Sequence, residues 1–194
     1  PDLAHFEELE TKLAQVARRE GFDARALPIR SVGVKADLRS YEHPVSLFSS
    51  APWPELLRWA GALYKEVPHV NRCLLWLGPG RPERFRPLAA TVTRERLDLL
   101  RAADAIVMDG LVRHGLYDAI WQCPTVLVPL AVDGRGAELV IVRPIRSERG
   151  MKATPAELPA ALLAELGERL LALPGVSGLA FDLTTKPPGT IEWE

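Results

Sequence analysis

Hydrophobic positions along the first part of the chain change from helical to strand spacing. Leu9, Leu13 and Val16 recur at helical intervals within residues 3–20, and Gly21 follows where such a helix is expected to end. The runs LPIRSVGV and HPVSLF are typical of strands, and the polar segment KADLRSYE between them is predicted to form a turn. A helix followed by paired strands predicts a protein of the α+β class.

The second part of the chain gives the same succession of signals. A helix is predicted from about Thr93 to Gly115, and TVLVPLAV and AELVIVRPI then form a hairpin across DGRG. Thr154, Pro155 and Glu157 have the spacing of a helix-capping box, which predicts that another helix starts there. The segment GPGRPERFRP is expected to be the loop between the two parts.

Two pairs of segments indicate an internal duplication. LRWAGALYKEVPHVNRCLLWL (57–77) and LAELGERLLALPGVSGLAFDL (163–183) align without a gap, each reading as a helix, a proline and a buried strand. GFDARALPIRSVG and GLYDAIWQCPTVLVPLAVDG match in the same order once a gap is allowed. Chance similarity would explain either pair alone. We therefore predict two duplicated α-β-β-α-β units, residues 1–88 and 89–194, packed as a pseudo-dimer.

Composition narrows the classes of partner. The chain has 194 residues, 47% of them hydrophobic, and a net charge of -1, so it has no overall charge that would attract nucleic acid or an acidic membrane. No apolar run approaches the ~20 residues of a membrane span, and the acidic start PDLAHFEELE lacks the apolar region of a signal peptide. Cys73 and Cys123 are isolated and the histidines are scattered, so we expect free thiols, no metal site and a cytoplasmic location.

Motifs for self-contained nucleotide chemistry are missing. The sequence has no GxxxxGK[ST] or GxGxxG phosphate loop, no GxSxG and no cysteine nucleophile signature. Either the chain takes part in chemistry that is completed elsewhere, or it is a binding module.

Several polar residues near predicted strand ends are candidates for ligand binding. Asp37 and Arg39 are two positions apart and would project on one side of extended backbone, and the amide of Gln122 can donate and accept hydrogen bonds to a purine edge. A solvated turn and a glutamine at the rim of the fold are the alternatives. A basic segment could attract an anion or simply be a solvated face: Arg143, Arg146, Arg149 and Lys152.

The final segment, TTKPPGTIEWE, has its own chemistry. Pro187 and Pro188 fix φ and remove two backbone donors, so we expect a rigid bend with Lys186 and Glu192 at its two ends. A lysine there offers a point charge to a phosphate, and a carboxylate accepts from ribose or purine donors. The alternative is a terminal edge strand pinned by Trp193.

This tail resembles the C-terminus of GMP synthase, the enzyme that amidates XMP to GMP with ATP and glutamine. Residues 100–129 and 27–41 are similar to two segments of its dimerisation domain. Two such domains in tandem, with KPPGTIEWE only in the second, resemble the long, eukaryote-type form of the enzyme. The resemblance covers essentially all of residues 1–194.

The resemblance implies an XMP site composed from both units. Arg39 and Lys186 would bind the phosphate, Gln122 would read the base, and Asp37 and Glu192 would accept from ribose or purine donors. The implied residues are Asp37, Arg39, Gln122, Lys186, Thr190, Ile191 and Glu192.

The resemblance also implies what the chain leaves to other domains. No residue here is expected to be catalytic or to bind a cofactor. ATP and Mg²⁺ would be bound by the ATP pyrophosphatase domain, and ammonia would come from the glutamine amidotransferase domain; neither domain is in this sequence. The chain would act with them in trans or as a fragment.

Two departures from the family pattern bear on the site. Ala36 stands where the family has glycine before the aspartate, and GPGRPERF stands where a second copy of the tail motif would be, so at most one nucleotide is expected per chain.

Two alternative functions remain open. A non-catalytic adaptor would dock or regulate a separate GMP synthase, and a purine nucleotide sensor would bind GMP as well as XMP without a partner.

Overall fold

The computed structural model of the protein describes residues 3–35 and 38–193. Within these ranges the helices are α1 (Leu3–Glu20), α2 (Trp53–Glu66), α3 (Arg94–Arg113) and α4 (Ala160–Leu171), with a 3-10 turn η1 (Tyr117–Ala119). The strands are β1 (Ala24–Ala26), β2 (Ser31–Lys35), β3 (Leu38–Leu47), β4 (Val70–Gly78), β5 (Phe85–Pro87), β6 (Thr125–Val132), β7 (Glu138–Val142), β8 (Ile145–Arg146), β9 (Thr154–Pro155) and β10 (Val176–Asp182). The α+β class is therefore confirmed.

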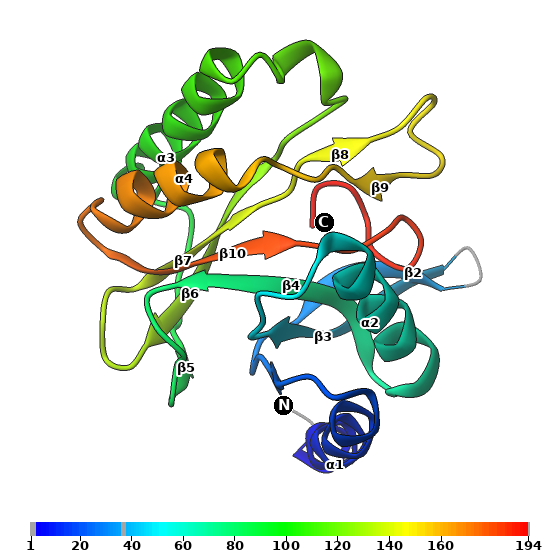
Figure 1. The fold of residues 1–194 in the computed structure, drawn as a ribbon. Coiled ribbons are helices and arrows are strands. Elements are labelled where there is room, and N and C mark those ends of the chain that lie inside the picture. The colour runs from blue at the N-terminus through cyan, green and yellow to red at the C-terminus, as the bar shows by residue number, and fades with distance from the viewer. Residues whose placement is uncertain (1–2, 36–37, 194) are drawn as a thin grey trace.

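One curled sheet runs through the centre of the molecule (Figure 1). In the described residues it has eight strands in the order β1-β3-β4-β10-β7-β6-β5, with β2 paired to β3. β3 is parallel to β4, β4 is antiparallel to β10, and β10 is parallel to β7. The outer pairs β1–β3 and β7–β6 are both antiparallel. The order β1-β3-β4 on one side of the centre thus has the same directions as β6-β7-β10 on the other.

The two faces of the sheet bury different side chains because successive strand residues point to opposite faces. From β4, Cys73 and Leu75 pack in the cluster that includes all four helices. Leu74 and Trp76 pack in a second cluster on the other face, where side chains from β6, β7 and the C-terminal tail also lie. The central strands β4, β10 and β7 each contribute side chains to both clusters, so both of their faces are covered.

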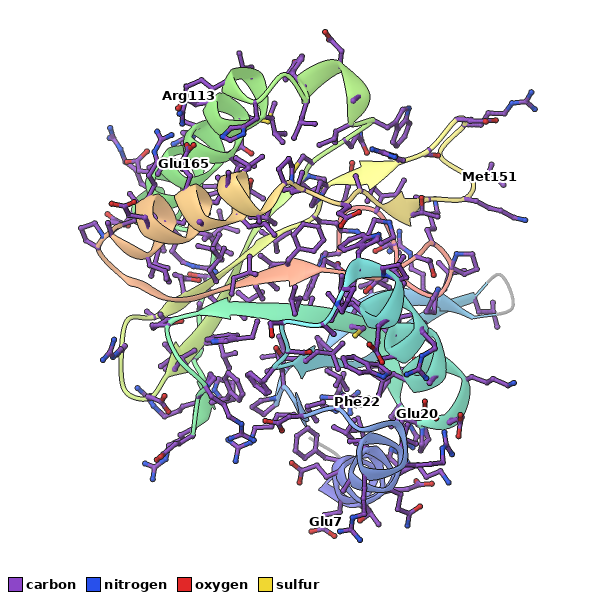
Figure 2. All side chains as sticks on the ribbon, viewed as in Figure 1. Glu7, Glu20, Phe22, Arg113, Met151 and Glu165 are labelled. Atoms are coloured by element: carbon purple, nitrogen blue, oxygen red, sulfur yellow. The ribbon has the colours of Figure 1, made fainter. Side chains whose placement is uncertain are left out.

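The helices lie in two pairs, α1 with α2 and α3 with α4 (Figure 1). Charged side chains join each pair at the surface. Arg113 of α3 forms an ion pair with Glu165 of α4 (Figure 2), and Arg169 also contacts that carboxylate.

Most of the predicted elements are confirmed. α1 ends just before Gly21, which has a positive φ of 80°. α3 begins after Thr93, whose hydroxyl accepts from the backbone N–H of Arg96. β4 and β10 open on Val70 and Val176, and β6 and β7 form the predicted hairpin.

Three local predictions are wrong. Residues 38–42 of KADLRSYE continue β3, because they pair with β2 throughout. Thr154 and Pro155 form β9 against β8 instead of capping a helix, and α4 starts later, after Pro159, which provides no side-chain cap. The expected loop GPGRPERFRP contains β5, which pairs with β6. In all three places, pairing with a distant segment overrides a local signal.

A glycine in β10 allows close packing at the centre of the sheet. A Cβ atom added at Gly178 would lie 2.4 Å from the ring of Trp76, which is held in place by its hydrogen bond to the carbonyl of Gly80. We predict that Gly178→Ala lowers the free energy of unfolding by about 1–3 kcal/mol, because the indole must move within a packed core. Urea denaturation measures this.

The matched control is Gly61→Ala in α2, where an added Cβ meets nothing within 4 Å. This change is expected to be neutral or to stabilise by up to about 1 kcal/mol, since alanine favours a helix interior. Equal effects of the two substitutions would contradict the packing argument.

Candidate functional site

Short backbone pairings connect Gln122 to Lys186 across the β8–β9 hairpin. Gln122 forms a bridge with Ile145, which pairs with Pro155 across β8 and β9. Ala153, next to β9, pairs with Lys186 through two backbone hydrogen bonds of 2.8 and 3.3 Å. Two candidates that are far apart in sequence therefore lie on one ladder of paired segments.

The same ladder continues from the tail to Arg39. Gly189 pairs with Gly33 of β2, and Gly33 pairs with Ser40 of β3, beside Arg39. Because neighbouring paired strands are about 4.8 Å apart, the backbones of Gly189 and Ser40 are separated by on the order of 10 Å. The ladder thus runs through Gln122, Lys186 and the neighbour of Arg39 in that order, with Gln122 and Arg39 at its two ends.

The tail approaches β2 more closely than side chains would permit. The N–H of Val34 donates to the carbonyl of Pro188 at 2.7 Å. A Cβ atom on Gly33 would lie 2.6 Å from that oxygen, and one on Gly189 would lie 2.7 Å from the methyl group of Thr184. A side chain at Gly33 would therefore collide with the backbone of the tail, and one at Gly189 would collide with the side chain of Thr184.

Beneath the tail lie three charged residues, Arg72, Arg143 and Asp182, each 0% exposed. We call them the Arg–Asp–Arg cluster. Asp182 Oδ2 accepts from Arg72 Nη1 and lies the same 3.0 Å from Arg143 Nη1. The same oxygen accepts from the indole N–H of Trp193 at 2.8 Å, and Oδ1 accepts from the N–H of Thr184 at 2.8 Å. One carboxylate therefore joins two strands of the sheet and the end of the tail.

The arginines use their other donors on the tail. Arg143 donates to the carbonyls of Thr184, Thr190 and Ile191 at 2.8–2.9 Å. Arg72 donates to the hydroxyl of Thr190 at 2.7 Å, and its guanidinium carbon lies 4.5 Å from the centroid of the Trp193 ring. These bonds hold the backbone of the tail in one position on the sheet.

Mutual charge compensation keeps this cluster ionised. Burial alone would raise the pKa of Asp182, but Arg143 and Arg72, with help from Thr184, hold that pKa below its ordinary value. Burial lowers the pKa of Arg72 to about 10, so that this arginine remains protonated at neutral pH.

The predicted site residues differ in how accessible they are. Arg39, Gln122 and Glu192 are exposed, and Lys186 is partly buried with its ammonium donating to the carbonyl of Gly150 at 2.7 Å. Thr190 and Ile191 are partly buried, and the hydroxyl of Thr190 is bonded within the protein, to Arg72 and Val32. Asp37 lies outside the described residues.

One sequence-based interpretation needs correction. Arg143 is not part of an exposed basic segment, because it is fully buried in the cluster; Arg146, Arg149 and Lys152 are exposed. Sequence reasoning missed Arg72 and Asp182 altogether. Their only signal was a charge inside an apolar run, in VNRCLLWL and in LAFDL, which is typical of a paired buried ion.

This arrangement is suited to binding and positioning an anionic, hydroxylated ligand. An ammonium and a carboxylate are carried by a tail that the sheet holds fixed, and an exposed guanidinium and amide lie on the same ladder. Within residues 3–35 and 38–193, no group of three or more His, Cys, Asp or Glu side chains could hold a metal ion. No helix among these residues is long and apolar enough to cross a membrane.

The cluster makes Asp182 a sensitive position. We predict that Asp182→Asn lowers the free energy of unfolding by about 3–5 kcal/mol, because two buried guanidinium groups lose their counter-charge. Asp98→Asn on α3 is the control: its carboxylate is 57% exposed in its pairs with Arg94 and Arg101, so the expected loss is below about 1 kcal/mol. Equal urea midpoints for the two variants would contradict this role.

The stability difference between wild type and Asp182→Asn should depend on pH. The pKa of Asp182 in the folded protein lies below the ordinary value of 3.8, so its charged form stabilises the fold above that value and this contribution is lost as pH falls through the folded pKa. We therefore expect a constant difference from about pH 7 to about pH 5, and a smaller one near pH 3. A difference that grows towards low pH would contradict the assignment.

Comparison with known proteins identifies relatives of this chain. Residues 109–193 match the family described as GMP synthase C terminal domain. A probable glutamine-hydrolysing GMP synthase of Leptospira interrogans is 35% identical over 182 residues, which is 92% of this chain and 30% of that protein. Glutamine-hydrolysing GMP synthases of Thermobifida fusca and Leifsonia xyli are 44% and 46% identical over 125 residues, 60% of this chain and 23% and 24% of those proteins.

The chain spans less than a third of the length of these curated relatives. The matched segment contains α4, β10 and the tail that the Arg–Asp–Arg cluster holds in place. Residues 109–193 are therefore similar to the C-terminal domain of GMP synthases, and the similarity to the Leptospira protein extends over most of the rest of the chain.

Proposed function

We propose that this chain is the XMP-binding C-terminal part of a GMP synthase. Its role would be to hold XMP while an ATP pyrophosphatase domain activates it and a glutamine amidotransferase domain supplies ammonia, either in trans or within one longer protein. The relatives are named as glutamine-hydrolysing GMP synthases, which supports GMP synthesis as the reaction. This sequence has no phosphate-loop motif, which supports binding of ATP by another domain. Such a protein would work in the cytoplasm.

The observation that carries this proposal is the fixed tail. Three of the proposed ligand residues, Lys186, Arg39 and Gln122, lie on the ladder that includes the tail. Lys186 and Arg39 would bind the phosphate through charge-assisted hydrogen bonds, and Gln122 would read the base. Glu192, which is exposed on the tail, and Asp37 would accept from ribose or purine donors.

The fixed backbone of the tail would favour the binding of XMP. The backbone of Thr190 and Ile191 is already held by Arg143, so XMP would not have to order the tail on binding. The contribution of the chain to catalysis would be to place the nucleotide correctly for groups on another domain.

The strand order supports a duplication of residues 1–88 and 89–194. The elements α1, β1, β3, α2 and β4 have the same order and strand directions as α3, β6, β7, α4 and β10. The two sets would be packed as a pseudo-dimer about the β4–β10 pair, as in the tandem, long form of the enzyme. Because the tail motif occurs once, one XMP would bind per chain.

Binding of XMP to the purified chain tests the proposal. Isothermal titration calorimetry should give one site, and Lys186→Ala and Arg39→Ala should each weaken binding by roughly 10- to 100-fold, the cost of losing a hydrogen bond to a charged group. The matched control is Lys65→Ala, because Lys65 is exposed on α2. This variant should bind XMP with the same affinity as the wild type.

Two outcomes would contradict the proposal. One is that the folded chain binds no XMP even when XMP is present at millimolar concentration, which is the result expected of a non-catalytic adaptor. The other is binding of XMP that neither Lys186→Ala nor Arg39→Ala weakens.

A further inference from the structure

Residues 147–152, which form most of the connection between β8 and β9, contact Lys186 directly. We call these residues the 147–152 loop. The ammonium of Lys186 donates to the carbonyl of Gly150 at 2.7 Å, and the backbone of Lys186 is bonded to Ala153, just after the loop. The loop thus determines where the end of this side chain lies.

A single hydroxyl closes the loop from inside. Ser147 Oγ donates to the carbonyl of Lys152 at 2.6 Å and accepts from the N–H of Gly150 at 2.8 Å. The hydroxyl therefore holds the Arg149–Gly150 and Lys152–Ala153 peptide units, which lie on either side of the Gly150–Met151 unit whose carbonyl accepts from Lys186.

The loop also packs against the segment that carries Gln122. Gly150 has a positive φ of 69°, and a Cβ atom there would lie 3.2 Å from the ring of Trp121. The N–H of Trp121 donates to the carbonyl of Ile145 at 2.9 Å. Gly150 is thus in contact with Lys186 on one side and with the neighbour of Gln122 on the other.

The rest of the loop faces solvent. Met151 is 78% exposed and lies at the outer end of the β8–β9 connection (Figure 2). Arg149 and Lys152 are also exposed. These residues can be changed without touching the contacts to Lys186, which makes Met151 a control within the same loop.

We propose that Ser147 and Gly150 are positioning residues for Lys186, and that the 147–152 loop orients its ammonium for the phosphate of the ligand. The proposal rests on the proposed function of the site. A lysine ammonium has three donors; the Gly150 carbonyl takes one, which would leave two for the phosphate of the ligand. Because the side chain is already ordered, less conformational entropy is lost when the phosphate binds.

Chemical labelling tests the contact without any ligand. With limiting acetylating reagent, mass spectrometry compares Lys186 with exposed Lys65 in the same sample. Wild-type Lys186 should react more slowly than Lys65, and Ser147→Ala should raise its relative rate roughly threefold or more, as the cost of a lost hydrogen bond implies. Ser147→Thr, which keeps the hydroxyl, and Met151→Ala should leave the rate at the wild-type value. An unchanged rate in Ser147→Ala would overturn the proposal.

A double-mutant cycle on XMP affinity tests the consequence for binding. Ser147→Ala should weaken XMP binding by roughly 3- to 10-fold, Ser147→Thr should restore it, and Ser147→Ala should have no further effect when Lys186 is already alanine. Equal weakening in both backgrounds would show that the loop acts independently of Lys186 and would overturn the proposal.

The two experiments separate two kinds of failure. If no variant binds XMP, the proposed function fails, and the labelling rates still decide whether the loop holds Lys186. If XMP binds and Lys186→Ala weakens it, but Ser147→Ala changes neither affinity nor labelling, only the positioning role is overturned.

Discussion

The constraint on which this structure depends is the need to pair two arginines that have no contact with water. Taking an ion out of water costs several kcal/mol, which is recovered only when its charge and its donors are all matched. Asp182 matches the charge of Arg72 and Arg143, and the carbonyls of the tail match most of their donors. The tail is therefore a structural partner of the sheet.

This constraint explains why the segment after β10 leaves the sheet and yet is ordered. Two prolines remove the backbone donors needed for a regular strand. Gly33 leaves room for the backbone of the tail, and Gly189 leaves room for the side chains of Thr184 and Arg72. The arginines then supply donors that a neighbouring strand would normally provide. A rigid, non-repetitive segment is the result.

Much of the fold could be predicted because its signals are local. Helical spacing in residues 3–20, Thr93 at the start of α3 and the Asp-Gly turn after β6 each act within a few residues. The errors occurred where distant pairing decides: β2 extends β3 through residues 38–42, and β8 makes a strand of Thr154 and Pro155.

The candidate site shows the same contrast between local signals and contacts between distant segments. The tail could be recognised from its own residues and from family resemblance. The Arg–Asp–Arg cluster could not, because Arg72, Arg143 and Asp182 are far apart in sequence and each looks like an isolated charge. Arg143 was even grouped with its exposed neighbours, since spacing along the chain does not reveal which face of a strand is buried.

The hydrogen bond from Trp193 to Asp182 has a consequence for biosynthesis. A chain emerging from the ribosome presents Arg72 and Arg143 long before the carboxylate, the indole and the carbonyls that they require have been made. Until Asp182 and residues 184–193 have emerged, Arg72 and Arg143 lack partners that they have in the fold. The strands made earlier should therefore stay loosely associated until these residues have been translated.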